Sequence, residues 1–316
     1  MKAAGKILLI DTIHPLFVKE LEDMGFTITD GTKLSEKEVL DSIDQYDGIE
    51  IRSRIKVDKS FLDKAVRLKF IARAGAGMES IDETYALQKG VQCLSAPEGN
   101  RDAVGEHVLS MILNLFNNIN RADREVRSGK WNREVNRGEE LMGKTFGIIG
   151  YGNMGSSVAR RLAGFECEVI AYDKYKSPSF DPFAKRVDLA ELQERSDIVS
   201  LHVPLTEETL GMINAAFIKD CKKPFYLINT ARGKTVRTPD LVDGLQSGKI
   251  KGACLDVIEY ESHSFENFSQ HEVPAAYRYL LESEKVVLTP HIAGWTHQSL
   301  QKIAKVLVEK IKKINS

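Results

Sequence analysis

The chain has 316 residues, of which 42% are hydrophobic and 28% charged, a composition typical of globular proteins large enough for two domains. Its formal net charge of −1 provides no electrostatic basis for binding nucleic acid or a membrane surface, and no run approaches the ~20 apolar residues of a membrane-spanning helix. The four cysteines lack C-x-x-C spacing, so we expect buried, reduced thiols in a cytoplasmic protein rather than zinc ligands or disulfides.

Strand and helix signals alternate over residues 1–99. His14 begins a predicted helix, Ser35 and Glu38 have the spacing of a capping box, and Gly90 ends another helix. Alternation of this kind predicts a doubly wound parallel sheet, whose ligands bind at the carboxyl ends of the strands. The apolar runs that predict its strands are 6–10, 26–28, 48–51, 68–72 and 91–94.

Two loops at these predicted strand ends are candidate anion sites. Arg52 and Arg54 flank Ser53, and guanidinium groups suit a carboxylate or phosphate, although the alternative is a pair of solvated surface arginines. The small-residue loop at 73–77 either offers backbone N–H groups to an anion or is a plain turn.

One long helix is predicted over residues 100–129. A helix of this length can bridge two domains, and His107 within it is expected to pack or to lie in an interface. Apolar residues spaced three and four apart form its predicted buried face: Val104, Val108, Met111, Leu115 and Ile119.

The strongest motif begins with the apolar run 145–149. Gly150, Gly152 and Gly155 follow at G-x-G-x-x-G spacing, before an amphipathic helix and a second strand that ends at Asp173. In dinucleotide-binding proteins the first glycine permits the tight turn, the second lets backbone approach the pyrophosphate, and the third lets the helix lie close to the strand. The helix N-terminus offers free N–H groups and a positive dipole end to the phosphates.

Asp173 favours NAD over NADP. Its carboxylate can accept hydrogen bonds from both ribose hydroxyls of NAD, but it would repel the 2′-phosphate of NADP. Two like charges ~4 Å apart cost up to about 4 kcal/mol at an effective dielectric constant near 20. Lys174 and Lys176 follow at once and could offset part of this repulsion, so the sequence leaves the strictness of the preference open.

Further strands are predicted at 197–202, 225–229, 252–257 and 286–289, with an aperiodic polar segment at 262–284. A final helix is predicted to carry Leu300, Ala304, Leu307 and Ile311. The strand ends would deliver Arg232, Asp256, Glu261 and His291 toward the nicotinamide of a bound cofactor. Histidine suits removal of a hydroxyl proton, a carboxylate can orient the ring, and arginine can bind a substrate carboxylate. Taken singly, a histidine after proline is more often structural, and Glu261 more often a solvated acid.

These motifs resemble a known family, the D-isomer-specific 2-hydroxyacid dehydrogenases, and within it the D-3-phosphoglycerate dehydrogenases. The resemblance covers nearly the whole chain. It is carried by IRSR at 51–54, RAGAG at 73–77, GKTFGIIGYG at 143–152, LHVPLT at 201–206, NTARG at 229–233, LDV at 255–257 and TPHIAG at 289–294.

The resemblance implies an α/β fold of two doubly wound, Rossmann-like domains. An NAD-binding domain (100–290) would be inserted into a flavodoxin-like substrate domain (1–99 and 291–316), and a homodimer would form through the NAD-binding domain. Larger phosphoglycerate dehydrogenases carry a C-terminal regulatory domain, which is not expected here. Ser262 stands where many members have proline after the catalytic glutamate, and the 262–284 segment is longer than in many members.

The resemblance also implies roles for individual residues, with no metal site. Arg232 would bind substrate, Glu261 (placed five residues after Asp256 by the family's spacing) would contact the imidazole, and His291 would be the acid/base. Asp256 would hold the nicotinamide carboxamide. The implied cofactor contacts are Gly150, Gly152, Asn153, Met154, Gly155, Asp173, Val203, Pro204, Thr209, Thr230, Ala231, Arg232, Asp256, His291 and Gly294. The implied substrate contacts are Arg52, Ser53, Arg54, Ala74, Gly75, Arg232 and His291.

The sequence therefore predicts an NAD-dependent oxidoreductase that moves a hydride between a D-2-hydroxy acid and NAD. 3-Phosphoglycerate is the leading substrate because Arg52 and Arg54 could supply charge for its phosphate. A glyoxylate/hydroxypyruvate reductase is the alternative within the same class. A non-enzymatic, NAD-sensing binding module is the alternative from another class.

Overall fold

The computed structural model describes residues 5–175, 181–261 and 274–315, which form two compact units. The first unit is Met1–Arg101 with Trp295–Ser316, and the second is Asp102–Gly294. The second unit is thus continuous in sequence and separates the two parts of the first. Lys176, Ser262 and the rest of 262–273 lie outside the described residues.

The first unit is built on a five-stranded parallel sheet with the order β2-β1-β3-β4-β5. This order is that of flavodoxin-like folds, as predicted. Its strands are β1 (Gly5–Leu9), β2 (Phe26–Asp30), β3 (Gly48–Ile51), β4 (Phe70–Arg73) and β5 (Gln92–Ser95). Its helices are α1 (Pro15–Asp23), α2 (Glu36–Ser42), α3 (Lys59–Lys64), α4 (Glu83–Gln88) and α12 (His297–Asn315), with a 3₁₀ turn η1 (Ile43–Gln45).

Helices cover both faces of this sheet, which explains why its strands are apolar runs rather than alternating patterns. Ile7 and Leu9 pack against α1 and the final helix α12, whereas Leu8 packs against α2, α3 and α4 on the other face. Gly99 allows the close approach of α12, because an added Cβ would lie 2.6 Å from the backbone nitrogen of Ile303. The predicted capping box of α2 is confirmed.

The second unit is built on a seven-stranded parallel sheet with the order β12-β11-β10-β9-β6-β7-β8. Six of these strands, β8-β7-β6-β9-β10-β11, have the strand order of dinucleotide-binding folds, so the predicted fold class is confirmed. Its strands are β6 (Thr145–Ile149), β7 (Glu168–Tyr172), β8 (Lys185–Arg186), β9 (Ile198–Leu201), β10 (Phe225–Asn229), β11 (Ile250–Leu255) and β12 (Val286–Leu288). Its helices are α6 (Ile119–Arg127), α7 (Asn153–Leu162), α8 (Leu189–Arg195), α9 (Ala215–Asp220), α10 (Thr238–Ser247) and α11 (Ala275–Glu282), with 3₁₀ turns η2 (Glu134–Asn136) and η3 (Gly233–Thr235).

The core of the second unit lies on both faces of its sheet. Val108 of α5 (Pro97–Phe116) and Val158 of α7 pack on one face, and Leu192 of α8 and Leu245 of α10 pack on the other. Complete burial of such a side chain contributes about 1.5–3 kcal/mol to the free energy of folding. This packing stabilises the sheet and so keeps the ends of its strands in fixed positions. Among the helices of the described residues, none is both long and apolar enough to cross a membrane.

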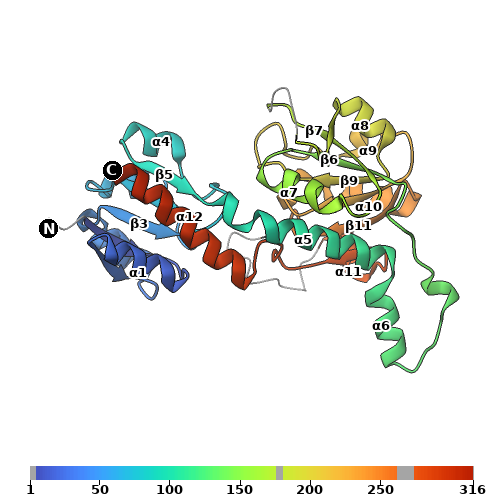
Figure 1. Cartoon of the computed structure of the whole chain (residues 1–316), viewed down its shortest axis with the longest axis horizontal. Coiled ribbons are helices and arrows are strands. Elements are labelled where there is room, and N and C mark those ends of the chain that lie inside the picture. Colours follow the sequence, from blue (N-terminus) through green and yellow to red (C-terminus); the bar gives the residue numbers. More distant parts are fainter. Residues whose placement is uncertain (1–4, 176–180, 262–273, 316) are drawn as a thin grey trace. The chain divides into compact units, whose positions relative to one another are not determined.

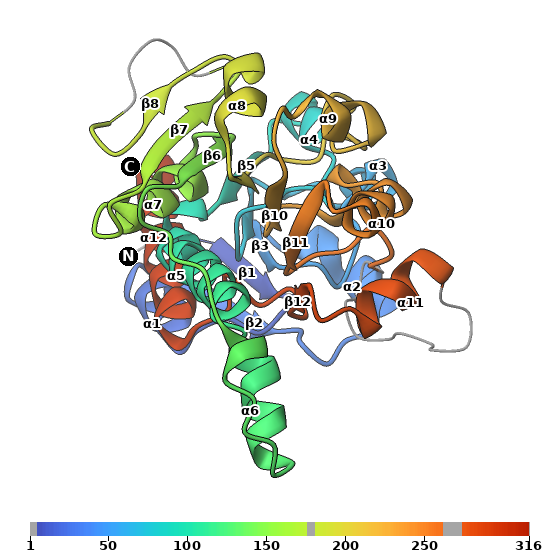
Figure 2. The same ribbon diagram turned by 90° about the vertical axis from the view of Figure 1, so that its right-hand side faces the viewer.

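The single helix predicted over 100–129 is wrong, because the chain forms two helices, α5 and α6. Asn118 interrupts them with a left-handed backbone (φ 52°), a conformation that asparagine adopts more readily than other non-glycine residues. Ile119, predicted to be on the buried face, is consequently exposed. Figures 1 and 2 both show α6 and the loop after it standing away from the sheet of the second unit.

The polar segment predicted at 262–284 contains a helix that the sequence pattern did not reveal. α11 follows Pro274, buries Leu280 completely, and places Tyr277 edge-on against Tyr260, with ring centroids 5.9 Å apart. Only four of its residues contact the core, so its hydrophobic period is too short to recognise.

All four cysteines are free thiols. Cys221 and Cys254 are buried, and Cys93 and Cys167 are half-buried. Burial raises the pKa of Cys93 and of Cys221 to about 11, which keeps these thiols protonated and poorly nucleophilic near neutral pH.

Candidate active site

The glycine-rich turn joins β6 to α7 in the geometry that the sequence predicts. Gly150 has φ 91°, and an added Cβ there would lie 2.6 Å from the carbonyl oxygen of His202. A Cβ on Gly155 would lie 2.1 Å from the carbonyl oxygen of Gly150. Nothing lies within 4 Å of the Cβ position of Gly152, so this residue leaves open space beside the start of α7. The turn therefore combines close packing with room for a phosphate.

Asp173 closes the other end of this motif, directly after β7. One carboxylate oxygen accepts the N–H of Tyr151 at 2.7 Å, and the other accepts the N–H of Tyr175 at 3.0 Å. With Tyr172 and Arg186, Asp173 lines a hollow of about 320 Å³ on the same unit. The carboxylate thus ties the glycine turn to the end of β7 beside a space of molecular size.

The loop after β9 lies against the glycine turn, as shown by the 2.9 Å distance from the Gly150 Cβ position to a methyl carbon of Val203. Thr209 fixes this loop, because its hydroxyl donates to the carbonyl of Pro204 at 2.6 Å and accepts the N–H of Thr206 at 2.8 Å. Burial lowers the pKa of His202 to about 3, so this ring stays neutral and is no acid/base candidate.

The loop after β10 positions Arg232. Asn229 is buried, its amide oxygen accepts the N–H of Ala231 at 3.0 Å, and its amide nitrogen donates to the carbonyl of Arg232 at 2.9 Å. The hydroxyl of Thr235 donates to the same carbonyl at 2.6 Å. Two hydrogen bonds, from Asn229 and Thr235, therefore hold the backbone carbonyl of Arg232. They fix the position from which its half-buried side chain extends. Sequence reasoning missed Asn229 because the residue lies inside the strand and not in the loop.

Gly233 brings the Arg232 loop against the loop after β11. A Cβ at Gly233 would lie 1.8 Å from the carbonyl oxygen of Ile258, so only glycine fits this contact. The carboxylate of Glu259 accepts the N–H of Thr238 at 2.8 Å and joins the same two loops a second time. The loop that carries Glu261 is thus fixed relative to Arg232.

Glu261 and His291 are paired, as the resemblance implies. One carboxylate oxygen of Glu261 lies 3.2 Å from Nδ1 of His291, and the other accepts the N–H of Ile258 at 3.0 Å. The imidazole side chain is 31% exposed, so solvent reaches part of it. A carboxylate at Nδ1 selects the tautomer with the proton on Nδ1, so Nε2 becomes the basic nitrogen.

Asp256 holds the His291 loop in place through hydrogen bonds to its carboxylate. Its carboxylate, 1% exposed, accepts the N–H groups of Ile292 and Ala293 at 2.8 Å each and the hydroxyl of Thr289 at 2.6 Å. The N–H of His291 donates to the Asp256 carbonyl at 2.8 Å, and the residue has φ 55°. These hydrogen bonds fix the backbone that carries His291 and so limit the positions that its imidazole can take. The predicted contact of Asp256 with the carboxamide stays a prediction.

His107 supports this anchor. Its Nε2 lies 3.0 Å from the hydroxyl of Thr289 and 3.6 Å from the carboxylate of Asp256. Burial lowers the pKa of His107, and the neighbouring Asp256 opposes that shift without reversing it. Neither Thr289 nor this role of His107 was predicted, because both depend on contacts between α5 and the end of β12.

The two predicted arginines of the first unit differ in their surroundings. Asp11 caps their loop by accepting the N–H of Arg52 at 2.6 Å and that of Ser53 at 3.2 Å. The guanidinium of Arg54 donates to backbone carbonyls, including those of Leu34 at 2.5 Å and Gly31 at 3.0 Å. The guanidinium of Arg52 instead stacks on the ring of Trp295, 4.0 Å from its centroid. Arg52 is thus the better candidate for binding a substrate anion.

In the small-residue loop after β4, two backbone N–H groups already donate hydrogen bonds to carbonyls of the protein. The N–H of Ala74 donates to the carbonyl of Ile51, and that of Gly75 to the carbonyl of Arg73, each at 2.8 Å. The predicted contacts of these two amides with a substrate carboxylate therefore require that both hydrogen bonds be displaced.

Glu50 is a buried carboxyl beneath the Arg52 loop. It is completely buried, one oxygen accepts the N–H of Asp11 at 3.3 Å, and the other has no hydrogen-bond partner among the described residues. Burial, assisted by the charge of Asp11, raises the pKa of Glu50 well above its ordinary value. Between its ordinary pKa and the raised one, the folded protein therefore holds a proton that the unfolded chain has lost.

This proton makes stability depend on pH, and Glu50→Gln should remove the dependence. Between the unfolded pKa, about 4.3, and the raised folded pKa, the free energy of unfolding of the unchanged protein should fall by up to about 1.4 kcal/mol per pH unit relative to Glu50→Gln. Below about pH 4 the two should differ by a constant amount. Urea unfolding at pH 4, 5, 6 and 7 measures this difference, and a difference independent of pH would contradict the account.

The strand order and the glycine turn of the second unit define an α/β protein of the dinucleotide-binding type. Residues 109–293 match the family described as D-isomer specific 2-hydroxyacid dehydrogenase, NAD binding domain. The chain belongs to this family, and its second unit carries the NAD-binding domain. Both the glycine turn and the family match therefore indicate that the second unit binds NAD.

Individual relatives differ in their activities. The D-3-phosphoglycerate dehydrogenase of Archaeoglobus fulgidus is 35% identical over 308 residues, which are 97% of this chain and 56% of that protein. The hydroxypyruvate reductase of Thermotoga maritima is 38% identical over 278 residues, 88% of each protein. The crystal structure of D-lactate dehydrogenase from Aquifex aeolicus complexed with NAD and lactic acid is 31% identical, with a TM-score of 0.81, over 98% of this chain and 95% of that one. The chain spans about half the length of the phosphoglycerate dehydrogenases it matches.

The second unit fits the cofactor on physical grounds as well. The hydroxyl of Thr230 is buried without a hydrogen-bond partner among the described residues, directly after β10 and beside Arg232. An unpaired buried hydroxyl is costly, so a ligand that bonds to it would gain free energy. Gly152 leaves space at the N-terminus of α7 for the pyrophosphate.

Proposed function

We propose that the chain is an NAD-dependent D-2-hydroxyacid dehydrogenase. The observation that carries this proposal is the pairing of Glu261 with Nδ1 of His291, beside the Arg232 loop, in a unit of the NAD-binding family. The strands that present these residues, β10, β11 and β12, are neighbours in the sheet that also presents the glycine turn. A purely structural histidine would need neither the partial exposure of its side chain nor the carboxylate at Nδ1.

Each proposed catalytic residue has one task. The glycine turn and Asp173 would hold NAD, which when bound would supply the acceptor or donor of the hydride at the carbinol carbon of the substrate. Arg232 binds the substrate carboxylate and holds the reacting carbon in place. Nε2 of His291 removes the hydroxyl proton during oxidation and returns it during reduction. Glu261 keeps the proton of the neutral ring on Nδ1 and stabilises the imidazolium once Nε2 is protonated.

D-3-Phosphoglycerate is the proposed substrate. Arg52 supports it, because a guanidinium held against Trp295 by stacking offers its N–H groups to a phosphate at low entropic cost. The similarity to D-3-phosphoglycerate dehydrogenases over nearly the whole chain also supports it. The alternative is reduction of glyoxylate or hydroxypyruvate, which is favoured by the 38% identity to a hydroxypyruvate reductase of matching length.

Arg52→Met should separate these substrates. Because a charge-assisted contact is worth about 1.5–3 kcal/mol, we expect kcat/KM for 3-phosphoglycerate to fall about 10- to 100-fold. The change for hydroxypyruvate, glyoxylate and D-lactate should stay within about 3-fold. Arg67→Met, at an exposed arginine of the same unit, is the matched control.

Two results would contradict this substrate assignment. One is a highest kcat/KM of the unchanged protein on an unphosphorylated acid. The other is an equal loss on every acid in Arg52→Met, which would make Arg52 a structural residue.

We further propose that the chain forms a homodimer through its second unit. The region around α6 supports this: Ile119, Val126, Trp131 and Val135 are all exposed, and Trp131 is 78% exposed. Sedimentation velocity of the full chain tests the assembly.

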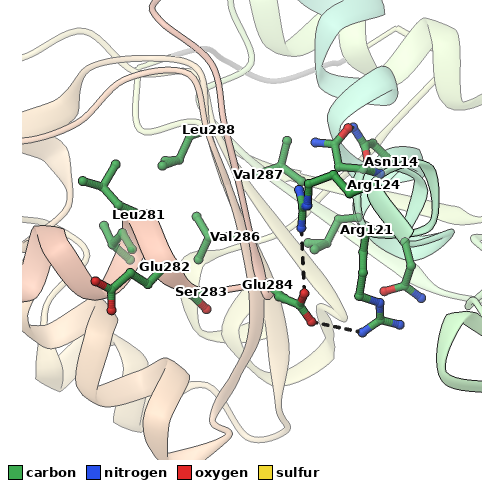
Figure 3. A pocket seen from close by; sticks show the side chains of 14 residues that line it. Asn114, Arg121, Arg124, Leu281, Glu282, Ser283, Glu284, Val286, Val287 and Leu288 are labelled. Carbon is green, nitrogen blue, oxygen red and sulfur yellow. Dashed lines mark hydrogen bonds and ion pairs between the residues drawn. The ribbon is translucent and has the colours of Figure 1, made fainter. Parts of the chain in front are cut away.

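The attachment of α6 to its unit is polar. Arg121 and Arg124 reach Glu284 at 3.6 and 3.8 Å beside a hollow of about 260 Å³ (Figure 3). These ion pairs fix the base of α6, so the exposed apolar residues around it are presented on a defined support.

A further inference from the structure

Glu208 contacts both residues that follow Asp173. One of its carboxylate oxygens lies 2.5 Å from the ammonium nitrogen of Lys174, and the other accepts the hydroxyl of Tyr175 at 2.6 Å. Lys174 belongs to the segment after β7, whereas Glu208 belongs to the loop after β9. Both oxygens of one carboxylate therefore hold two consecutive side chains from the segment that follows another strand.

The strand order shows that the contact between Glu208 and Lys174 spans the glycine turn. β6, which ends in the glycine turn, lies between β9 and β7. The Glu208–Lys174 pair thus connects the two strands that flank the nucleotide turn. Glu208 sits on a fixed loop, because Thr209 bonds to the Pro204 carbonyl and Leu210 to the Thr206 carbonyl.

The Glu208–Lys174 pair is relevant to how strictly the protein prefers NAD over NADP, which the sequence alone leaves open. A dinucleotide held by Asp173 would place the 2′-position of its adenosine ribose next to that residue. A free ammonium on Lys174 would offset the repulsion between Asp173 and a 2′-phosphate. The mutual contact raises the pKa of Lys174 and lowers that of Glu208, so both groups are charged near neutral pH.

We propose that Glu208 is a specificity-determining residue: by neutralising and holding Lys174, it keeps the preference for NAD over NADP. Glu208 acts through Lys174 and is a positioning residue rather than a catalytic one. The proposal rests on the proposed binding of NAD at Gly150–Asp173. It adds that the preference depends on a residue outside the dinucleotide motif.

The test compares NADH and NADPH binding by fluorescence titration of the full chain at low salt. Glu208→Gln should lower the Kd for NADPH about 3- to 10-fold and leave that for NADH within about 2-fold, because a freed lysine interacts only with the additional phosphate. The pair is exposed, so the gain should shrink in 0.5 M salt. Glu207→Gln, at the exposed neighbouring residue, is the matched control and should change neither Kd.

A double variant makes the test specific to Lys174. Lys174→Met combined with Glu208→Gln should show no gain for NADPH, since the cation that Glu208 releases is then missing. A gain that persists in this double variant would overturn the proposal, as would equal changes for both nucleotides in Glu208→Gln. These binding measurements need no turnover, so a failure here is distinct from a failure of the proposed catalysis. Absence of NADH binding by the unchanged chain would overturn both.

Discussion

Replacing His291 with alanine should lower kcat for oxidation of the preferred D-2-hydroxy acid by about 10²- to 10⁴-fold, the range that general acid–base catalysis contributes. The Kd for NADH should stay within about 3-fold, because the residues proposed to hold the nucleotide, the glycine turn and Asp173, lie at other strand ends of the sheet. Steady-state kinetics and NADH fluorescence titration measure the two effects. His297→Ala, which removes an exposed imidazole, is the control.

Glu261→Gln refines this prediction. Gln can still bond to Nδ1 of His291 but brings no negative charge, so the imidazolium formed during oxidation loses its stabilisation. We expect kcat to fall less than in His291→Ala and the pH dependence of kcat to shift. Full activity of His291→Ala would remove the imidazole from the mechanism. NAD binding without turnover of any 2-hydroxy acid by the unchanged protein would favour the non-enzymatic NAD-binding module.

Gly155→Ala should weaken NADH binding by about 10-fold or more. The new Cβ would lie 2.1 Å from the carbonyl oxygen of Gly150, so α7 must move away from the turn and its N–H groups leave the pyrophosphate position. Overpacking of this kind costs about 1–3 kcal/mol, and 1.4 kcal/mol corresponds to a tenfold change in affinity. Titration of NADH fluorescence measures the loss, and circular dichroism checks that the fold persists.

Gly164→Ala provides the matched control for that variant. Nothing lies within 4 Å of its Cβ position, so the same substitution in the same unit should leave the Kd unchanged. Unaltered NADH affinity in Gly155→Ala would show that the turn between β6 and α7 does not hold the nucleotide.

The parallel sheets could be predicted because their strands are buried on both faces. Such strands appear in the sequence as short, continuous apolar runs, and few other structures bury a run such as 145–149. The glycine turn could also be predicted, because Gly150 and Gly155 each meet a steric demand that a larger residue cannot, and Gly152 leaves open space beside the start of α7. Helices with little contact to the core were harder: α11 buries a single residue fully, and the break at Asn118 depends on one backbone conformation.

The partners of the charged residues could not be predicted from the sequence. Arg52 and Arg54 look equivalent in the chain, yet one stacks on Trp295 and the other is bonded to backbone carbonyls. Asp256 was expected to hold the cofactor, and its carboxylate also organises the whole His291 loop. Such roles are decided by residues 20 or more positions away, whose proximity only the fold creates.

The central claim is that hydride passes between NAD and a 2-oxo acid at the site where His291 and Glu261 meet. The most direct measurement follows deuterium from NADH labelled at both C4 positions into the product, with phosphohydroxypyruvate, hydroxypyruvate, glyoxylate and pyruvate as oxidants. The account predicts a 2-hydroxy acid carrying deuterium at C2, of D configuration wherever C2 is a stereocentre, and none above background with His291→Ala. Bound NADH that transfers no deuterium to any of these acids would contradict it.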